Sequence, residues 1–185
     1  EPEFSTFSAD DKPKTTIKSS EIYERIESLG YILIRGDEHH GKTSFVSRLF
    51  SKALLVNIIP VQLTAKEIST GTDEKRDRLI EERIGDHYGT SAIEQYRALG
   101  RSQKLILIDD LDSLGMNADK YSRALSYIKR SFQNAVVTLG ERFDVSLLGS
   151  TEVANELADF DEYKLLGFSY AMRSDLIQRW YALDL

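Results

Sequence analysis

A run of eight residues combines two glycines, a lysine and a hydroxyl group at a spacing that suits phosphate binding. The run has the form G-x-x-x-x-G-K-[ST] and consists of Gly36, Asp37, Glu38, His39, His40, Gly41, Lys42 and Thr43. The glycines allow backbone conformations in which successive N–H groups turn inward toward anionic oxygens. Lys42 adds a positive charge for the β- and γ-phosphates of a nucleotide, and Thr43 offers a hydroxyl to Mg²⁺. We expect this run and the next residue, Ser44, to bind the nucleotide, and Lys42 also to take part in catalysis.

The neighbouring sequence predicts a strand before this run and a helix after it, which is the setting of a P-loop. Residues 31–35 are a short apolar stretch, and the apolar residues after Thr43 recur at helical spacing to about Lys52. Such a helix would point its unpaired N–H groups and the positive end of its dipole at the same phosphates. A coincidental glycine-rich turn is the alternative, and it would not require this strand and helix.

A second acidic pattern follows residues 105–108, whose four apolar side chains suit a strand buried on both faces of a parallel sheet. Asp109 and Asp110 come directly after it, as in a Walker B motif. Ligands of such sheets bind at the carboxyl edge of the strands, so these carboxylates should lie beside the P-loop. We expect Asp109 to bind Mg²⁺ together with Thr43, and Asp110 to orient or deprotonate the attacking water as a catalytic residue. An exposed turn is the alternative for the acidic pair taken alone, and Glu141 or a flanking domain is the alternative source of the base.

The four variable positions of the P-loop carry two acidic side chains and two histidines, and the orientation of these side chains affects phosphate binding. Asp37 and Glu38 would repel phosphate if they turned inward, so they must point outward or hydrolysis will be poor. His39 and His40 are adjacent and permit a zinc site, but three histidines and no cysteine are a thin supply of ligands. We expect both histidines to be loop residues near the phosphates.

Composition limits the class of protein. The chain has 185 residues, a net charge of −6 and no cysteine, which excludes disulfides, thiolate metal sites and cysteine nucleophiles within it. The acidic balance argues against a general nucleic-acid or acidic-membrane binder. No apolar run has membrane-spanning length and no signal peptide opens the chain, so we expect a cytoplasmic protein. It begins without Met, and we expect residues 1–19 to be a flexible linker or tag remnant before one domain at residues 20–185, cut from a larger protein.

Strands and helices are predicted to alternate along this domain, which indicates an α/β fold with a mostly parallel sheet. Pro60 should lie near the start of its strand, because proline cannot donate to a ladder. Residues 64–72 are polar with no predicted element, and residues 140–162 have no assignment. The predicted helices lie at about residues 21–29, 42–52, 73–88, 91–100, 118–132 and 171–183. The predicted strands lie at about residues 31–35, 61–63, 105–108, 135–139 and 163–168.

A helical region and a strand separate the two motifs, so the chain resembles the additional-strand (ASCE) class of P-loop ATPases. The pair Asp109-Asp110 after an apolar strand is similar to the corresponding sequence of the AAA-like STAND group. Members of this group are signal-transducing ATPases that switch on when their nucleotide state changes. The resemblance spans about residues 20–185. It implies a three-layer α/β/α fold, a mostly parallel five-stranded sheet in the order 5-1-4-3-2, and ATP or ADP with Mg²⁺ as ligands. Residues 167–180 are also similar to a segment of bacterial proteins that join a calcineurin-like phosphoesterase to such an ATPase, although no phosphoesterase motif is present.

The STAND resemblance implies an arginine that senses the γ-phosphate soon after a threonine that ends the fourth strand. Here three residues separate Thr138 from Arg142, so the arginine is displaced along the chain. Arg142 is the candidate catalytic sensor, and a solvated loop arginine is the alternative. Arg173 opens the last predicted helix and could also reach phosphate, with a surface position as the alternative.

These features predict an Mg²⁺-dependent ATPase domain, slow in isolation, that acts as a nucleotide-controlled switch within a larger protein. Asp112 and Gly115 match the D-x-x-G of GTPases, but no N-K-x-D motif exists, so ATP is favoured over GTP. The alternatives are a hydrolysis-deficient nucleotide-binding module for assembly, a small-molecule P-loop kinase, and a nucleic-acid motor or origin-type ATPase. A kinase would need an arginine-rich lid, and no such cluster stands out. The expected partners are the nucleotide and flanking domains, with oligomerisation possible in the full-length protein, and neither nucleic acid nor membrane is expected to bind directly.

Overall fold

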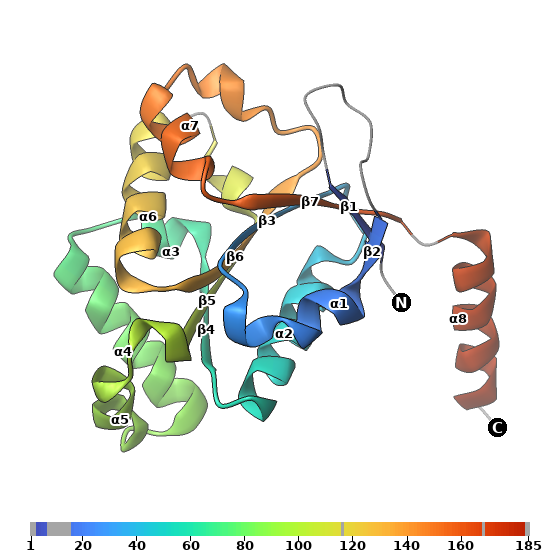
Figure 1. Cartoon of the computed structure of the whole chain (residues 1–185), viewed down its shortest axis with the longest axis horizontal. Helices are drawn as coiled ribbons and strands as arrows, with labels where there is room; N and C mark the ends of the chain where they lie inside the picture. Colours follow the sequence, from blue (N-terminus) through green and yellow to red (C-terminus); the bar gives the residue numbers. More distant parts are fainter. Residues whose placement is uncertain (1–2, 7–15, 116, 168, 184–185) are drawn as a thin grey trace.

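One mixed sheet organises the chain. The computed structural model describes residues 3–6, 16–115, 117–167 and 169–183. Seven strands lie in the order β2-β1-β7-β3-β6-β5-β4 (Figure 1). The strands are β1 (Glu3–Thr6), β2 (Thr16–Lys18), β3 (Tyr31–Gly36), β4 (Ile59–Thr64), β5 (Lys104–Asp109), β6 (Asn134–Gly140) and β7 (Asp161–Leu165).

Five of these strands form a parallel core in the expected arrangement. β7, β3, β6, β5 and β4 each pair in parallel with their neighbours. Numbered along the chain from β3, their order is 5-1-4-3-2, as the resemblance implied. β1 and β2 extend this core beside β7 as antiparallel strands, so the whole sheet has seven strands rather than five.

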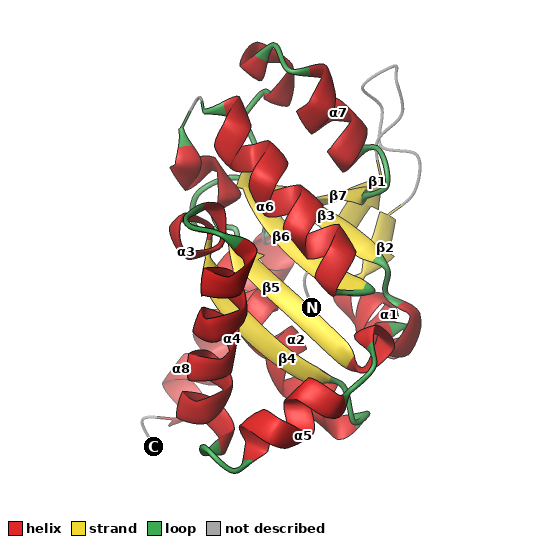
Figure 2. Ribbon diagram, turned by 90° about the vertical axis from the view of Figure 1, so that its left-hand side faces the viewer, coloured by secondary structure: helices red, strands yellow, loops and turns green. Residues whose placement is uncertain are grey.

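Helices cover both faces of the sheet, which confirms the three-layer architecture (Figure 2). α1 and α2 pack on one face, and the helices from α3 to α7 pack on the other. Within the described residues no helix is long and apolar enough to cross a membrane. The α-helices are α1 (Ser19–Glu24), α2 (Lys42–Leu55), α3 (Ala65–Ser69), α4 (Asp73–Tyr88), α5 (Ala92–Ala98), α6 (Ala118–Ser131), α7 (Thr151–Leu157) and α8 (Tyr170–Leu183). The 3₁₀ turns are η1 (Ile26–Ser28), η2 (Arg101–Gln103), η3 (Leu111–Leu114) and η4 (Val145–Leu148).

The inner strand β5 shows why residues 105–108 are all apolar. Leu105 and Leu107 belong to the core on the α2 side, whereas Ile106 and Ile108 belong to the core on the α6 side. All four side chains are completely buried. Since successive side chains of a strand alternate between faces, a strand covered on both sides needs a continuous apolar run.

The N-terminal segment that we expected to be a linker contributes β1 and β2 to the sheet. Phe4 is completely buried, and its ring centroid lies 4.9 Å from that of Phe45 and 6.4 Å from that of Tyr163. The N–H of Leu166 donates to the carbonyl oxygen of Glu3 at 2.9 Å. The flexible-linker expectation therefore fails for these two strands, because residues distant in sequence supply the packing that holds them. The rest of residues 1–15 lies outside the described part of the chain.

Two stretches without a predicted element contain short helices. Thr64 caps α3: its N–H donates to Glu67 Oε2 at 2.7 Å, and its hydroxyl accepts from the N–H of Glu67 at 3.3 Å. This is a capping box, and its T-x-x-E pattern is visible in the sequence. α7 begins after Ser150, whose hydroxyl accepts from the N–H of Val153 at 3.4 Å, and the helix packs on α6.

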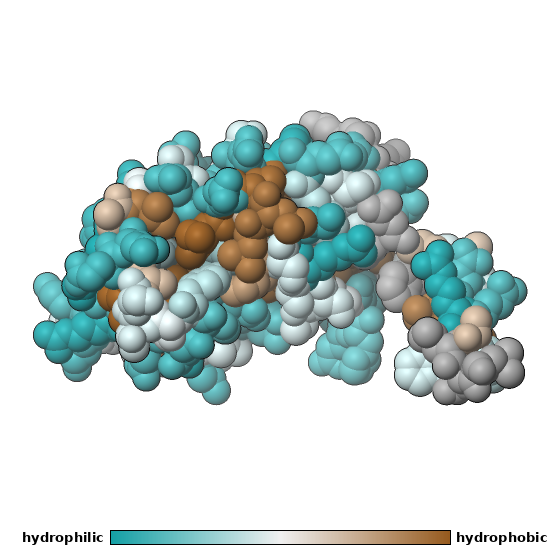
Figure 3. All heavy atoms as spheres, turned by 90° about the horizontal axis from the view of Figure 1, so that it is seen from below, coloured by the Kyte–Doolittle hydropathy of each residue, from teal (hydrophilic) through white to brown (hydrophobic). Residues whose placement is uncertain are grey.

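α8 stands apart from the three layers (Figure 1). Its predicted bounds were nearly right, but the side chains on its predicted apolar side are exposed: Leu176 by 54%, Ile177 by 55% and Trp180 by 68%. Figure 3 shows the same separation from below, where hydrophilic residues cover most of the view and a band of apolar residues crosses the body. Apolar spacing predicted the helix correctly without predicting a surface to bury it.

We predict that Phe4→Ala destabilises the fold by about 3 kcal/mol, because it removes a buried ring from the core between β1 and α2. Urea unfolding followed by far-UV circular dichroism measures this loss. The matched control is Glu3→Ala, an exposed neighbour in the same strand, whose effect should stay within about 0.5 kcal/mol. Equal stability of the two variants would mean that β1 is not part of the folded core.

Candidate nucleotide-binding site

Three parallel strands end together beside an open cleft. β3 ends at Gly36 and β6 at Gly140, and the two glycines are register partners. β5, the next strand along, ends at Asp109. The cleft has a volume of about 1160 Å³ and lies at this carboxyl edge, where ligands of parallel sheets bind. It is lined by Asp37, Glu38, His39, Gly41, Lys42, Thr43, Ser44, Asp110, Asp112, Ser113, Gly140, Glu141, Arg142 and Phe143.

The P-loop has the backbone of an anion cradle. His39 and Gly41 take left-handed conformations, with φ of 63° and 93°, and α2 begins directly afterwards at Lys42. Gly41 caps the helix without a side chain, so the first N–H groups of α2 face the cleft free of intrahelical partners. Free N–H groups at a helix N-terminus, next to a loop that turns its own backbone inward, form an arrangement that fits phosphate oxygens.

Lys42 folds back over the loop. Its ammonium group donates to the carbonyl oxygens of Gly36 at 3.0 Å and Asp37 at 3.3 Å. The carbonyl oxygens thus hold the positive charge at the wall of the cleft that also contains Thr43 and Ser44. The charge is positioned by backbone atoms, so it does not depend on a neighbouring acid.

The carboxylate of Asp109 joins the P-loop to the sheet. Its Oδ2 accepts a hydrogen bond from the hydroxyl of Thr43 at 2.7 Å, and its Oδ1 accepts one from the hydroxyl of Thr138 at 2.6 Å. The hydroxyl of Thr138 in turn accepts from the N–H of Asp110 at 2.8 Å. A carboxylate beside a hydroxyl at the mouth of a phosphate cradle is the oxygen donor set that suits Mg²⁺.

Thr138 is the residue in this group whose contact the sequence analysis missed. It is completely buried in β6, where its neighbours Val137 and Leu139 are apolar. A buried hydroxyl needs a partner, so a lone threonine in an apolar strand was a usable indication of a polar contact on one side of that strand.

Asp110 occupies a different environment from Asp109. Its backbone is left-handed, with φ of 52° and ψ of 58°, and its side chain lines the cleft. Partial burial raises the pKa of this carboxyl above its ordinary value, the negative charge of Asp109 adds to the rise, and the ammonium of Lys42 opposes it. Asp109 and Asp110 therefore lie in different surroundings, which separate roles in metal binding and in proton transfer would require.

Contacts from two strands, β3 and β7, hold the loop after β6 against the cleft. The N–H of Glu141 donates to the carbonyl oxygen of Gly36 at 3.1 Å, and its carboxylate pairs with Lys164 of β7. Arg35, in β3, donates to the carbonyl oxygen of Phe143. Arg142 lies between these anchored residues; it is exposed and lines the cleft.

Gly140 permits a close approach at the start of the same loop. A Cβ atom at this position would lie 2.7 Å from Oδ2 of Asp112, so a side chain here would require the carboxylate of Asp112 to shift. Asp112 thus packs directly on the backbone between β6 and Arg142 and lines the cleft as a further carboxylate. Its Oδ1 is buried without a hydrogen-bond partner among the described residues.

The remaining predicted residues of the loop separate into two groups. Asp37, Glu38, His39 and Ser44 line the cleft, and Oδ1 of Asp37 accepts from the N–H of Glu38 at 3.1 Å. His40 faces β7 instead, with its Nδ1 3.3 Å from the carbonyl oxygen of Leu165. In the described part of the chain, no three His, Asp or Glu side chains gather as a metal cluster.

A second cleft of about 590 Å³ borders the first, and Asp110 and Ser113 line both. Asp109 and Glu67, from the capping box of α3, lie in its wall. Arg83 pairs with Glu67 there. The sequence analysis did not predict this second cleft, because its wall depends on α3 and on the packing of α4.

Comparisons with solved structures identify the fold. Domain III of the DnaA replication initiation protein from Thermotoga maritima matches with a TM-score of 0.59 at 13% identity, over 90% of this chain and 67% of that one. AMPPCP-bound DnaA from Aquifex aeolicus matches with a TM-score of 0.54 at 16% identity, over 87% of this chain and 48% of that one. The Orc1 protein of Aeropyrum pernix in complex with DNA matches with a TM-score of 0.54 at 15% identity, over 87% and 47% of the two chains.

These similarities show that the chain has the same α/β fold as the matched DnaA domains. Identities of 13% to 16% show the fold alone. The chain spans about half the length of the Aquifex DnaA chain that it matches. No family model and no curated protein matches the sequence.

We predict that the two threonines bound to Asp109 respond differently to replacement by valine. Thr138→Val should lower the free energy of unfolding by about 1–3 kcal/mol, because the completely buried hydroxyl of Thr138 would no longer bond the carboxylate of Asp109 and the N–H of Asp110. Thr43→Val should cost less, because Thr43 is exposed and water can replace its hydroxyl. Urea unfolding without nucleotide or Mg²⁺ measures both losses, and equal losses would contradict the burial difference on which the prediction rests.

Proposed function

We propose that this chain is an Mg²⁺-dependent ATP-binding domain that hydrolyses ATP slowly and acts as a nucleotide-controlled switch within a larger protein. The observation that carries the proposal is the hydrogen-bonded chain Thr43–Asp109–Thr138, which joins the P-loop, the Walker B strand and the neighbouring strand at one edge of the sheet. These hydrogen bonds connect Thr43 of the P-loop with Asp109 of the Walker B motif. Their hydroxyl and carboxylate oxygens are ligands of the kind that Mg²⁺ prefers.

Each residue of the cleft has a proposed part in this function. The backbone of residues 37–44 and the ammonium of Lys42 hold the phosphates, and the oxygens of Thr43 and Asp109 hold Mg²⁺, which when bound neutralises phosphate charge. Asp110 orients the attacking water and accepts its proton. The raised pKa of Asp110 supports this role, because a carboxyl whose pKa lies closer to neutral pH is the better base.

Arg142 is the proposed sensor of the γ-phosphate. It lines the same cleft as Lys42, and its loop is anchored on both sides by contacts to β3 and β7. An arginine held at the mouth of the cleft can pair with phosphate oxygens and so connect the nucleotide state to the loop after β6. This proposed switch, with an adenine nucleotide as ligand, corresponds to the STAND resemblance of the sequence.

The proposed partners are the nucleotide and the flanking domains of the same protein, with self-association open to the full-length chain. A hydrolysis-deficient binding module and a small-molecule P-loop kinase are the competing functions. Two assays, one of inorganic phosphate release and one of phosphate transfer to an acceptor, distinguish the three functions. An ATPase releases phosphate, a kinase transfers it, and a binding module does neither. The net charge of −6 does not favour direct contact with nucleic acid.

We predict that saturating ATP or ADP with Mg²⁺ raises the melting temperature of the chain by several degrees. A ligand present at about 100 times its Kd stabilises the native state by about 2.7 kcal/mol. Lys42→Ala should remove most of this shift, since it deletes the cation at the phosphates. Calorimetric titration with ATP, ADP and GTP checks the affinities: no binding to folded protein refutes the proposed function, and a strong preference for GTP refutes the choice of adenine.

We predict that Asp109→Asn and Asp110→Asn have different effects. Asp110→Asn should slow single-turnover hydrolysis on the order of a hundredfold while ATP affinity stays nearly unchanged, because it removes a base and no phosphate contact. Asparagine also tolerates the left-handed backbone of this position.

Asp109→Asn should instead weaken the dependence of ATP affinity on Mg²⁺, measured by titration with and without EDTA. The assignment is wrong if both variants lose binding equally, or if hydrolysis by Asp110→Asn is unchanged.

A further inference from the structure

The cleft at the P-loop is lined by more negative than positive side chains. Two of its lining residues, Lys42 and Arg142, are basic. Five are acidic: Asp37, Glu38, Asp110, Asp112 and Glu141. The wall therefore has an excess of three formal negative charges, although the ligand expected there is itself an anion.

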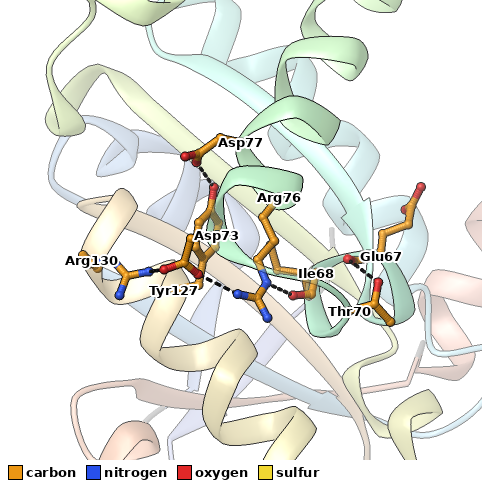
Figure 4. A network of polar contacts seen from close by, with 8 residues as sticks. All are labelled: Glu67, Ile68, Thr70, Asp73, Arg76, Asp77, Tyr127 and Arg130. Atoms are coloured by element: carbon orange, nitrogen blue, oxygen red, sulfur yellow. Dashed lines mark hydrogen bonds and ion pairs between the residues drawn. The ribbon is translucent and has the colours of Figure 1, made fainter.

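A polar network between α4 and α6 shows how this chain neutralises acidic side chains outside the cleft (Figure 4). Asp73 pairs with both Arg76 and Arg130. Asp77 accepts a hydrogen bond from the hydroxyl of Tyr127 at 2.5 Å. Both carboxylates of this network thus have partners within the protein and need no ligand to satisfy them.

The acidic side chains of the cleft are not neutralised in the same way. Glu141 pairs with Lys164 of β7. Asp37, Glu38 and Asp112 form no ion pair with any residue that the structure describes. Their charges therefore act on whatever enters the cleft, because like charges repel with little screening in a partly enclosed site.

The two basic side chains of the cleft are held apart from these acids. The ammonium group of Lys42 donates to the backbone carbonyl oxygens of Gly36 and Asp37. Arg142 makes neither a hydrogen bond nor an ion pair within the described part of the chain. Both positive charges are thus available to phosphate, but the acidic side chains outnumber them.

Asp37 also competes directly with phosphate for a donor. Its Oδ1 accepts a hydrogen bond from the N–H of Glu38 at 3.1 Å. This N–H belongs to the loop backbone whose amides are proposed to hold the phosphates. A carboxylate of the protein therefore occupies a donor that suits an anion, and a phosphate that takes this donor must displace it.

We propose that Asp37 and Glu38 determine which nucleotide the cleft retains, by favouring ADP over ATP and by making ATP binding depend on Mg²⁺. ATP carries one more negative charge than ADP, so the same unpaired carboxylates weaken ATP binding more. Mg²⁺ reduces the charge of the nucleotide, and ATP needs this reduction most. The inference rests on the proposed function, and it makes the ADP-bound form the more stable state of the switch at equal nucleotide concentrations.

The experiment is calorimetric titration of the full chain with ADP and ATP, with Mg²⁺ and again with EDTA. With Mg²⁺, ADP should bind about tenfold more tightly than ATP, and EDTA should weaken ATP by the larger factor. The preference for ADP should shrink at about 1 M salt, where the Debye length falls to about 3 Å. Equal affinities with Mg²⁺, or a preference that salt does not change, would overturn the inference and leave the proposed function intact. Absence of binding by either nucleotide, to this chain and to the variants below, would refute both.

A double variant then tests the two residues. Asp37→Asn combined with Glu38→Gln removes both charges and keeps the size of both side chains. It should tighten ATP binding at least about tenfold and ADP binding less, so that the two affinities become nearly equal. The matched control is Glu24→Gln combined with Glu27→Gln, which changes the net charge equally at two exposed residues that do not line the cleft. The assignment is wrong if the ratio of the two affinities is unchanged in the first variant, or changes equally in the control.

Discussion

The two oxygens of one carboxylate connect three parts of the chain that are far apart in sequence. Asp109 receives a hydroxyl from the P-loop helix on one oxygen and a hydroxyl from β6 on the other. In the order 5-1-4-3-2, β6 lies between β3, the strand before the P-loop, and β5, which ends at Asp109. This order lets one carboxylate accept from both hydroxyls. β6 is thus part of the site, because it supplies the hydroxyl of Thr138 to Asp109.

The same edge of the sheet combines rigid strands with unusual backbone conformations. His39, Gly41 and Asp110 all have positive φ, and all three line the cleft beside regular parallel strands. Such conformations are unfavourable for residues other than glycine, and they persist where the surroundings determine them. The N–H of Asp110 on Thr138 is one such constraint, and the helical hydrogen bond from Phe45 to the carbonyl oxygen of Gly41 is another.

Much of this molecule could be predicted from sequence because the governing interactions are local. The P-loop spacing, the apolar run of β5 and the alternation of strands and helices predicted an α/β fold with a mostly parallel sheet, and the resemblance to additional-strand ATPases implied its strand order. The contacts between distant segments could not be predicted in the same way: the packing of Phe4 in β1, the hydroxyl of Thr138 on Asp109, and the loop that holds Arg142 at the cleft. The exposed side of α8 is the opposite case, since apolar spacing predicts a helix but not what covers it. The capping box of α3 was readable in Thr64 and Glu67, and the polar composition around it concealed it.

The outer edge of β4 has a consequence for how this molecule meets others. An open strand edge offers free N–H and carbonyl groups to which a strand of another chain can add. Here Pro60 has no N–H, and its carbonyl oxygen accepts the hydroxyl of Tyr88 at 2.8 Å. Farther along, the N–H of Thr64 is taken by Glu67. Two positions of this edge are therefore closed to strand addition, which disfavours a β-sheet that continues through β4 from one molecule to the next. At high protein concentration, aggregation by strand pairing at this edge is correspondingly less favourable.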